Sequence, residues 1–353
     1  MACRLDLLTV HAQRNHRCEL YASRRPSRLP TLATGTMQEH KRSNDGQGKQ
    51  KDIVVLAFGG NSLLQRGEDL TMENQRKNAA HAAQQLSEFQ GRHPEYQLCI
   101  THGNGPQVGL LAQGDTKSGL DVLDAETEGQ IGYILETEIA NALQNNKEVV
   151  THLTQVVVDR RDEAFQNPTK HIGKWMTEDQ AKTAARENGW AIARDGKQWR
   201  RVVPSPEPKE IIELRAIEIL LKENINVICC GGGGIPVAVD NNASYRRYGI
   251  ECVIDKDAVS GLLAAKLGAK WFIMVTDAGA VYDPKKWPDE KVPIESPMHQ
   301  SQLSAEDFEA GSMSPKIKAA LKFINQTGGK VGIGRISDLE HIMAGRAGTL
   351  ILP

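Results

Sequence analysis

The sequence has few aromatic residues, no long apolar run and almost no net charge. Aromatic residues make up 5% of its 353 residues, and 43 Lys and Arg nearly balance 44 Asp and Glu. The longest apolar runs cover residues 53–58 and 271–275, whereas a membrane-spanning helix needs about 18 apolar residues or more. We therefore expect no membrane partner. The balanced charge argues against a general nucleic-acid binder, and the composition is otherwise that of a globular protein.

Cysteine is scarce and shows no metal-binding spacing. The six cysteines form no Cys-x-x-Cys pair, and the adjacent Cys229 and Cys230 could not comfortably chelate one metal. Cys99, Cys229 and Cys252 lie in or beside apolar, strand-like runs. This pattern favours reduced core cysteines in a protein that is not secreted.

Three common nucleotide-binding signatures are absent as well. A dinucleotide fingerprint needs Gly-x-Gly-x-x-Gly, but Gly231 and Gly233 are followed by Pro236 at the third position. None of the four Gly-Lys pairs is followed by Ser or Thr, as a Walker A loop requires. The His-Arg-Asp and Asp-Phe-Gly motifs of protein kinases are missing too. If the protein binds a nucleotide, it does so with other residues.

Positive charge gathers at the amino terminus. Residues 1–51 carry ten Lys and Arg against four Asp and Glu, a net charge of +6, and the remaining 302 residues carry a net charge of −7. Arg-rich, acid-poor leaders are typical of organelle transit peptides. An unstructured basic tail and a misassigned start codon are the alternatives. We expect a cytoplasmic protein, or one in a mitochondrion-related organelle or plastid if this leader is a transit peptide.

A regular alternation of strand-like and helical segments begins at residue 52. Apolar, β-rich runs predict strands over 52–58, 96–101, 149–153, 155–158, 225–230, 271–276, 331–334 and 349–352. Helical patterns cover 72–89, 127–143, 209–224, 257–267 and 315–326. Such alternation predicts an α/β fold, a three-layer α/β/α sandwich with a mostly parallel central sheet. Residues 159–208 are polar and interrupt it, so we expect a small inserted subdomain there.

Three glycine-rich turns each follow an expected strand. They are Gly59-Gly60-Asn61, Gly103-Asn104-Gly105 and the four glycines at 231–234. Ligands gather beyond the carboxyl ends of parallel strands, and glycine lets backbone N–H groups approach a phosphate closely. One such loop is often only a tight turn. Three together indicate a phosphorylated ligand.

Two lysines stand at expected helix starts. Lys256 lies between Asp255 and Asp257, and Lys316 follows a Ser-Pro pair whose proline we expect at the first helical position. The helix dipole disfavours a cation there. Either lysine alone would usually be a solvated surface charge, but two in this position suggest a pair that faces an anion. Phosphoryl transfer needs such cations because its transition state spreads negative charge over several oxygens.

Two further polar residues leave alternatives open. His102 begins a glycine-rich turn and could be a base or a polar residue that binds the loop backbone. Asp277 follows an expected strand and could hold a nucleotide ribose, orient a lysine or cap a turn. Neither residue by itself defines a reaction.

The chain resembles the carbamate kinases, which belong to the amino-acid-kinase fold family. The matching segments appear in family order over about residues 52–353, at 57–61, 101–109, 127–133, 158–170, 199–206, 230–237, 253–257 and 311–316. The Asn-Pro-Thr-Lys segment that ends at Lys170 and the Trp-Arg-Arg-Val-Val-Pro-Ser-Pro segment lie in the insertion, and they are typical of carbamate kinases within the wider family.

The resemblance implies the amino-acid-kinase fold, a homodimer and a reversible reaction of carbamoyl phosphate with ADP that gives ATP and carbamate, with Mg²⁺. It implies that residues 52–158 bind the carbamate or carbamoyl end, that 159–208 form a lid and that 209–353 bind the nucleotide. Lys256, Lys316 and Lys170 would be the catalytic residues. The implied substrate-binding residues are Gly59, Gly60, Asn61, Gly103, Asn104 and Gly105. The implied nucleotide-binding residues are Gly232, Gly233, Asp255, Thr276 and Asp277.

No convincing general base accompanies the lysines, and the implied reaction needs none. Carbamate is already an anion, so its oxygen can attack phosphorus without losing a proton, and the protein supplies positioning and charge compensation. The residues Phe58, His171, Ser314 and Ala278-Gly279 depart from the usual family pattern. Two alternatives therefore stay open: another phosphotransferase of the same fold, and a non-catalytic nucleotide-binding paralogue.

Overall fold

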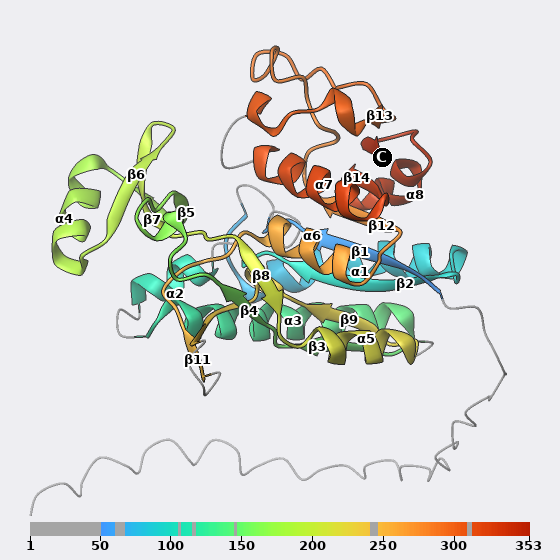
Figure 1. Cartoon of the computed structure of the whole chain (residues 1–353), viewed down its shortest axis with the longest axis horizontal. Coiled ribbons are helices and arrows are strands. Elements are labelled where there is room, and N and C mark those ends of the chain that lie inside the picture. The colour runs from blue at the N-terminus through green and yellow to red at the C-terminus, as the bar shows by residue number, and fades with distance from the viewer. Residues whose placement is uncertain are drawn as a thin grey trace, which may run out of the picture. The chain divides into compact units, whose positions relative to one another are not determined.

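The main sheet carries the strand ends from which the site is built. The computed structural model describes residues 51–60, 68–104, 107–114, 118–144, 147–240, 246–308 and 313–353. Within them, eight strands form this sheet in the order β13 (Met298–His299), β15 (Thr349–Leu352), β14 (Lys330–Gly334), β12 (Trp271–Val275), β1 (Asp52–Phe58), β2 (Tyr96–His102), β9 (Asn226–Cys229) and β3 (Val149–His152). Neighbouring strands are parallel except β14 and β15 (Figure 1).

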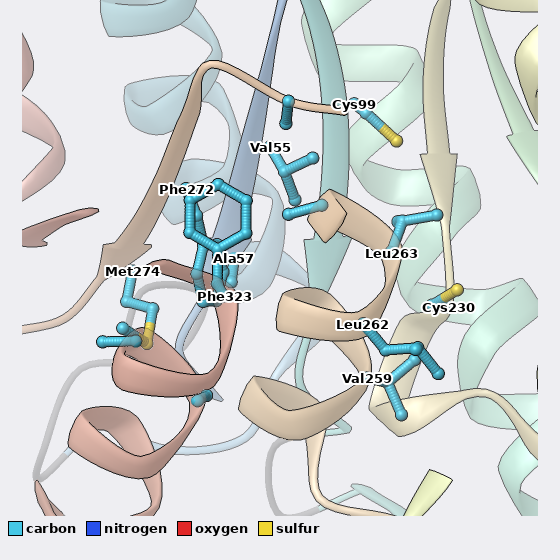
Figure 2. Close-up of a cluster of buried hydrophobic side chains, with 14 of the residues drawn as sticks. Val55, Ala57, Cys99, Cys230, Val259, Leu262, Leu263, Phe272, Met274 and Phe323 are labelled. Carbon is cyan, nitrogen blue, oxygen red and sulfur yellow. The ribbon is translucent and has the colours of Figure 1, made fainter. Parts of the chain in front are cut away.

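Strand β1 is buried on both faces, as its continuous apolar sequence predicts. Val54, Leu56 and Phe58 pack in one core with the helices α1 (Met72–Arg92) and α3 (Leu120–Leu143), and α8 (Leu339–Met343) joins this core. Val55 and Ala57 point to the other core, shown in Figure 2, with α5 (Leu214–Lys222), α6 (Lys256–Lys266) and α7 (Met313–Thr327). The sheet is therefore covered by helices on both faces, and the predicted α/β/α sandwich with a mostly parallel sheet is confirmed.

Two smaller sheets are formed by strands that lie between β3 and β12 in the sequence. The first has the order β11 (Arg246–Gly249), β10 (Ile235–Asp240), β4 (Gln155–Val158) and β8 (Pro208–Ile211). The second has the order β5 (Lys170–Met176), β7 (Gln198–Val203) and β6 (Ala191–Asp195), and the helix α4 (Glu178–Asn188) packs on it. Figure 1 shows this second sheet and α4 set apart from the main sheet. Residues 170–203, which hold this sheet and α4, lie in the segment expected to form a lid, and we call them the lid sheet. The short helix α2 (Gln107–Gly114) lies against β5.

Some predicted elements differ from the structure. The helix predicted over 209–224 is confirmed only for α5 at Leu214–Lys222, and its start is wrong, because Pro208–Ile211 form β8 and pair antiparallel with β4. The two ends of β8 are buried and its middle is exposed, a pattern set by the partner strand. Helix α3 begins seven residues earlier than expected, at Leu120. Helix α7 begins at Met313, so Pro315 is its third residue.

Strand β9 lies between β2 and β3 although it comes from the later part of the chain. The main sheet is therefore shared between the segments 52–158 and 209–353, and no single boundary in the sequence divides it. Among the described residues, no helix has both the length and the apolar character needed to cross a membrane.

Candidate active site

The three glycine turns meet because the strands before them, β1, β2 and β9, are neighbouring parallel strands. The N–H of Gly59 donates to the carbonyl oxygen of Val275 at 2.9 Å, and the N–H of Gly103 donates to that of Phe58 at 3.0 Å. The turn after β9, at Gly231–Gly233, contacts β2 and α6. These turns open on a cavity of about 770 Å³ at the carboxyl end of the sheet.

Eleven of the residues predicted to form the site line this cavity. They are Gly59, Gly60, Gly103, Asn104, Lys170, Gly232, Asp255, Lys256, Thr276, Asp277 and Lys316. Gly233 does not line it. Its φ is +106°, and a Cβ there would overlap the carbonyl oxygen of Ile254, so this glycine allows two backbone segments to pack closely. Asn61 and Gly105 lie outside the described residues.

Asp257 joins the two lysines predicted from the helix starts. Its Oδ1 lies 2.6 Å from Nζ of Lys256, and its Oδ2 lies 2.7 Å from Nζ of Lys316. Burial alone would raise the pKa of Asp257, but the charges of Lys256 and Lys316 hold it well below its ordinary value. Burial lowers the pKa of Lys256, and the nearby charge of Lys316 lowers it further. The cluster of Lys256, Asp257 and Lys316 therefore holds two cations around one anion.

Asp255 explains why helix α6 begins at Lys256. Its Oδ1 accepts hydrogen bonds from the backbone N–H groups of Asp257 and Ala258 at 3.0 and 3.1 Å, which is the geometry of an N-cap. Its Oδ2 lies 3.0 Å from Nζ of Lys170 at the start of β5. Although burial alone would raise the pKa of Asp255, the charge of Lys170 brings it below the ordinary value. One aspartate thus caps the helix and holds the lysine of the lid sheet.

The turn after β9 is close-packed against the turn after β2. Gly232 has a φ of +69°, and a Cβ on it would overlap the side-chain amide of Asn104. This position therefore needs glycine both for its backbone conformation and for space. The glycine turn after β9 is therefore in direct contact with the glycine turn after β2.

His102 does not line the cavity. The residue is fully buried, and its Nδ1 lies 3.2 Å from the carbonyl oxygen of Gly103, so the neutral ring can donate to the turn. Burial lowers its pKa to about 4. Of the two interpretations given above, the geometry favours a residue that binds the loop backbone.

Comparison with known proteins agrees with this geometry. The family model described as "Amino acid kinase family" matches residues 52–334. A carbamate kinase of Haemophilus influenzae is 46% identical over 305 residues, which cover 84% of this chain and 96% of that protein. A carbamate kinase of Pyrococcus furiosus is 39% identical over 318 residues, which cover 85% and 99%.

The chain belongs to the amino acid kinase family, in its carbamate kinase group.

A solved structure supports the same assignment. A carbamate kinase from Giardia lamblia bound to AMP-PNP has a TM-score of 0.74 and 36% sequence identity, and the match covers 86% of this chain and 98% of that one. An N-acetylglutamate synthase from Neisseria gonorrhoeae reaches a TM-score of 0.53 at 12% identity, a likeness of fold alone. The match to the Giardia lamblia structure therefore supports the group that the sequence comparison indicates.

Sequence reasoning missed part of the cavity wall. Tyr282 and Trp287 line the cavity, and their rings stack with centroids 5.7 Å apart and planes 7° apart. Arg200 lines it from the lid sheet, where its guanidinium donates to Asp195 at 3.1 Å and lies over the ring of Trp175. The irregular segment after β12 carries no periodic pattern, so only the presence of aromatic residues in a polar stretch could have pointed to Tyr282 and Trp287.

The cavity's donor set fits a magnesium ion that enters with a nucleotide. Among the described residues, no group of three or more His, Cys, Asp and Glu is placed to hold a metal ion. Four carboxylates line the cavity. Asp255 and Asp257 contact lysines, Asp277 follows β12, and Asp307 lies in the short 3₁₀ helix before α7. Mg²⁺ usually takes one or two carboxylates, substrate phosphates and water. A cavity with few protein ligands suits that mode of binding.

Proposed function

We propose that the protein transfers a phosphoryl group reversibly between carbamoyl phosphate and ADP, giving carbamate and ATP. The observation that carries the proposal is the pair Lys256 and Lys316, held by Asp257 in the cavity where the glycine turns meet. The relatives named carbamate kinase support this choice of substrate class.

The chemistry requires positioning and charge compensation. In the direction of ATP synthesis, an oxygen of the ADP β-phosphate attacks the phosphorus of carbamoyl phosphate, and the bond from phosphorus to the carbamate oxygen breaks. Carbamate leaves as an anion, so no side chain has to donate or remove a proton. Lys256 and Lys316 would stabilise the charge that spreads over the equatorial oxygens of the phosphoryl group.

We assign the substrate ends by the turns that line the cavity. The turns at Gly59-Gly60 and Gly103-Asn104 would hold the carbamoyl end, together with Asn61 and Gly105. Gly232 and the segment Thr276-Asp277, with Asp255, would flank the nucleotide, whereas Gly233 would support the turn by its close packing. Asp277 would be the carboxylate nearest to a nucleotide-bound Mg²⁺, which would neutralise phosphate charge when bound.

Lys170 would reach the phosphates from the lid sheet. Its partner Asp255 caps helix α6, and both side chains are about a quarter to a third exposed. An anion that enters the cavity would compete with Asp255 for this lysine, so substrate binding would draw the lid sheet over the reacting groups. We further propose a homodimer, in line with the resemblance.

A substrate panel tests the proposal against the two alternatives. The purified protein is incubated with ADP, Mg²⁺ and, in turn, carbamoyl phosphate, acetyl phosphate and N-acetylglutamyl phosphate, and ATP formation is followed. Rapid ATP formation from carbamoyl phosphate alone supports the proposal. Preference for another acyl phosphate would assign a different phosphotransferase, and nucleotide binding without any turnover would assign a non-catalytic paralogue.

A further inference from the structure

A buried carboxyl group stands directly behind the proposed substrate-binding turn. Asp124 lies in the second turn of α3 and is 1% exposed. Its Oδ1 accepts a hydrogen bond from Nδ2 of Asn104 at 2.6 Å. Asn104 lines the cavity, whereas Asp124 does not. Asp124 can therefore act on the substrate only through Asn104.

If Asp124 is ionised, this pair has too few hydrogen-bond donors for its buried acceptors. Oδ2 of Asp124 and Oδ1 of Asn104 are both buried and have no hydrogen-bond partner among the described residues. An ionised carboxylate has only acceptors, and the amide oxygen is also an acceptor. A protonated carboxyl group supplies the missing donor, because its O–H can bond the amide oxygen while its carbonyl accepts the amide N–H. A carboxylic acid and a primary amide then satisfy each other through two hydrogen bonds.

The charges around Asp124 agree with a neutral group. The carboxyls of Asp121 and Glu128 lie on the same helix, the thiol of Cys252 faces it from the segment before α6, and Lys170 faces it from β5. Lys170 is the one cation among these, and its ammonium is held by Asp255 at 3.0 Å. Burial raises the pKa of Asp124 well above its ordinary value, although the hydrogen bond from Asn104 opposes this.

The turn after β9 also confines the amide of Asn104. Gly232 packs so closely that a Cβ on it would overlap the amide group of Asn104. The amide thus contacts both this turn and the carboxyl group of Asp124 on α3. A partner that forms hydrogen bonds with both the oxygen and the nitrogen of this amide holds the amide in one orientation.

We propose that Asp124 is a neutral carboxylic acid that pairs with Asn104 through two hydrogen bonds and is thereby a positioning residue for the carbamoyl end of the substrate. The inference rests on the proposed function for its kinetic consequence, but not for the protonation state. Asp124→Asn keeps a neutral group of the same shape that has both N–H donors and a carbonyl acceptor. Asp124→Ala removes the pairing and leaves the buried amide of Asn104 without a partner.

Infrared difference spectroscopy tests the protonation state without any substrate. The spectrum of the wild type minus that of Asp124→Asn at neutral pH is expected to show the carbonyl band of a protonated carboxylic acid. The matched control is Asp121→Asn, one turn earlier on α3, whose difference spectrum is expected to lack this band. Glu128 contributes equally to every spectrum and cancels. A carboxylate band in place of the acid band for Asp124 would overturn the proposal.

Kinetics test the positioning role. Asp124→Asn is expected to stay within about threefold of the wild type in kcat/KM for carbamoyl phosphate. Asp124→Ala is expected to lose about tenfold or more in kcat/KM, because the amide of Asn104 is no longer held in one orientation, with the KM for ADP unchanged. At alkaline pH the wild type should lose activity as Asp124 ionises and its oxygens face the amide oxygen, and Asp124→Asn should keep a larger share of its neutral-pH activity.

Two kinetic results would contradict the positioning role of Asp124. An Asp124→Asn variant as impaired as Asp124→Ala, or an Asp124→Ala variant equal to the wild type, would contradict the positioning role. If the wild type makes no ATP from carbamoyl phosphate, the proposed function fails, and the infrared result alone then decides the protonation state.

Discussion

Nζ of Lys316 lies 2.7 Å from Oδ2 of Asp257, although 59 residues separate them in the sequence. This contact ties the start of α7 to the start of α6. Both side chains are largely buried, so the contact is screened little by solvent. The pair places a cation from the last third of the chain beside Lys256, and the proposed chemistry depends on this arrangement.

We expect Asp257→Asn to weaken both the fold and the activity. The substitution leaves two buried lysines without their shared anion, and removing one partner of a buried ion pair typically costs about 3–5 kcal/mol. Urea unfolding should show a loss of that order, and ATP formation should fall by orders of magnitude. A variant as stable as the wild type would show that the lysines are compensated elsewhere.

The stabilisation by Asp257 should disappear in acid. Lys256 and Lys316 hold the pKa of this carboxyl below the value of an unfolded aspartate, although burial opposes them. A group with a depressed folded pKa stabilises the protein above its unfolded pKa of about 3.9 and loses this effect as the pH falls further. The difference in unfolding free energy between the wild type and Asp257→Asn should therefore be constant from pH 5 to 7 and shrink below pH 4. A constant difference down to pH 2 would contradict the assignment.

Much of this arrangement could be predicted from the sequence. The continuous apolar run of β1 indicated a strand buried on both faces, and the glycine turns indicated which strand ends carry the site. The dipole-disfavoured positions of Lys256 and Lys316 indicated an anion site, and both line the cavity. These signals are local, because each depends on a few consecutive residues.

The remainder depends on contacts between distant segments. The place of β9 between β2 and β3 is set by pairing between strands that are 128 and 77 residues apart in the sequence, as for Cys99 with Val227 and Val149 with Asn226. The sequence of β8 predicts part of a helix, but its pairing with β4 makes it a strand. Asp124 reads as one more polar residue on a helix, and only its packing behind Asn104 makes it a candidate for function.

Gly232→Ala should impair the site more than the backbone conformation alone explains. Gly232 and Gly189 share a φ of +69°, but a Cβ at Gly189 meets nothing within 4 Å, whereas one at Gly232 overlaps Asn104. Gly189→Ala, the matched control, should therefore cost only the ~1–2 kcal/mol of a left-handed backbone. Gly232→Ala should lose more stability and, by moving Asn104, raise the KM for carbamoyl phosphate. Equal stability losses in both variants would argue against the close packing.

Lys170→Ala should reduce turnover without weakening the fold. Its partly exposed pair with Asp255 is expected to contribute about 0–1 kcal/mol to stability, so the melting temperature should hardly change. If Lys170 contacts the phosphates, kcat should fall at least tenfold. Lys174→Ala, in the same strand but exposed and away from the cavity, is the control and should behave as the wild type. Similar kcat values for both variants would remove Lys170 from the proposed machinery.

Glu128 should make the protein less stable as the pH rises from 5 to 8. Its carboxyl group accepts the backbone N–H groups of Thr154 and Gly231, and burial raises its pKa to about 8. The folded state then binds a proton that the unfolded state has released above about pH 4.3, so unfolding becomes easier with rising pH until the folded group also ionises. The unfolding free energy of the wild type should fall over this range relative to that of Glu128→Gln. A difference that is independent of pH would show that Glu128 is ionised in the fold throughout.

The role of Lys256 in phosphoryl transfer can be tested by measuring ATP formation from carbamoyl phosphate and ADP. The proteins compared are the wild type, Lys256→Met and Lys266→Met. Lys256 and Lys266 are the first and last residues of α6, and the exposed Lys266 does not line the cavity. If Lys256 stabilises the transferred phosphoryl group, the wild type and Lys266→Met form ATP rapidly and Lys256→Met loses several orders of magnitude in rate. An undiminished rate in Lys256→Met would remove this lysine from the proposed phosphoryl-transfer site.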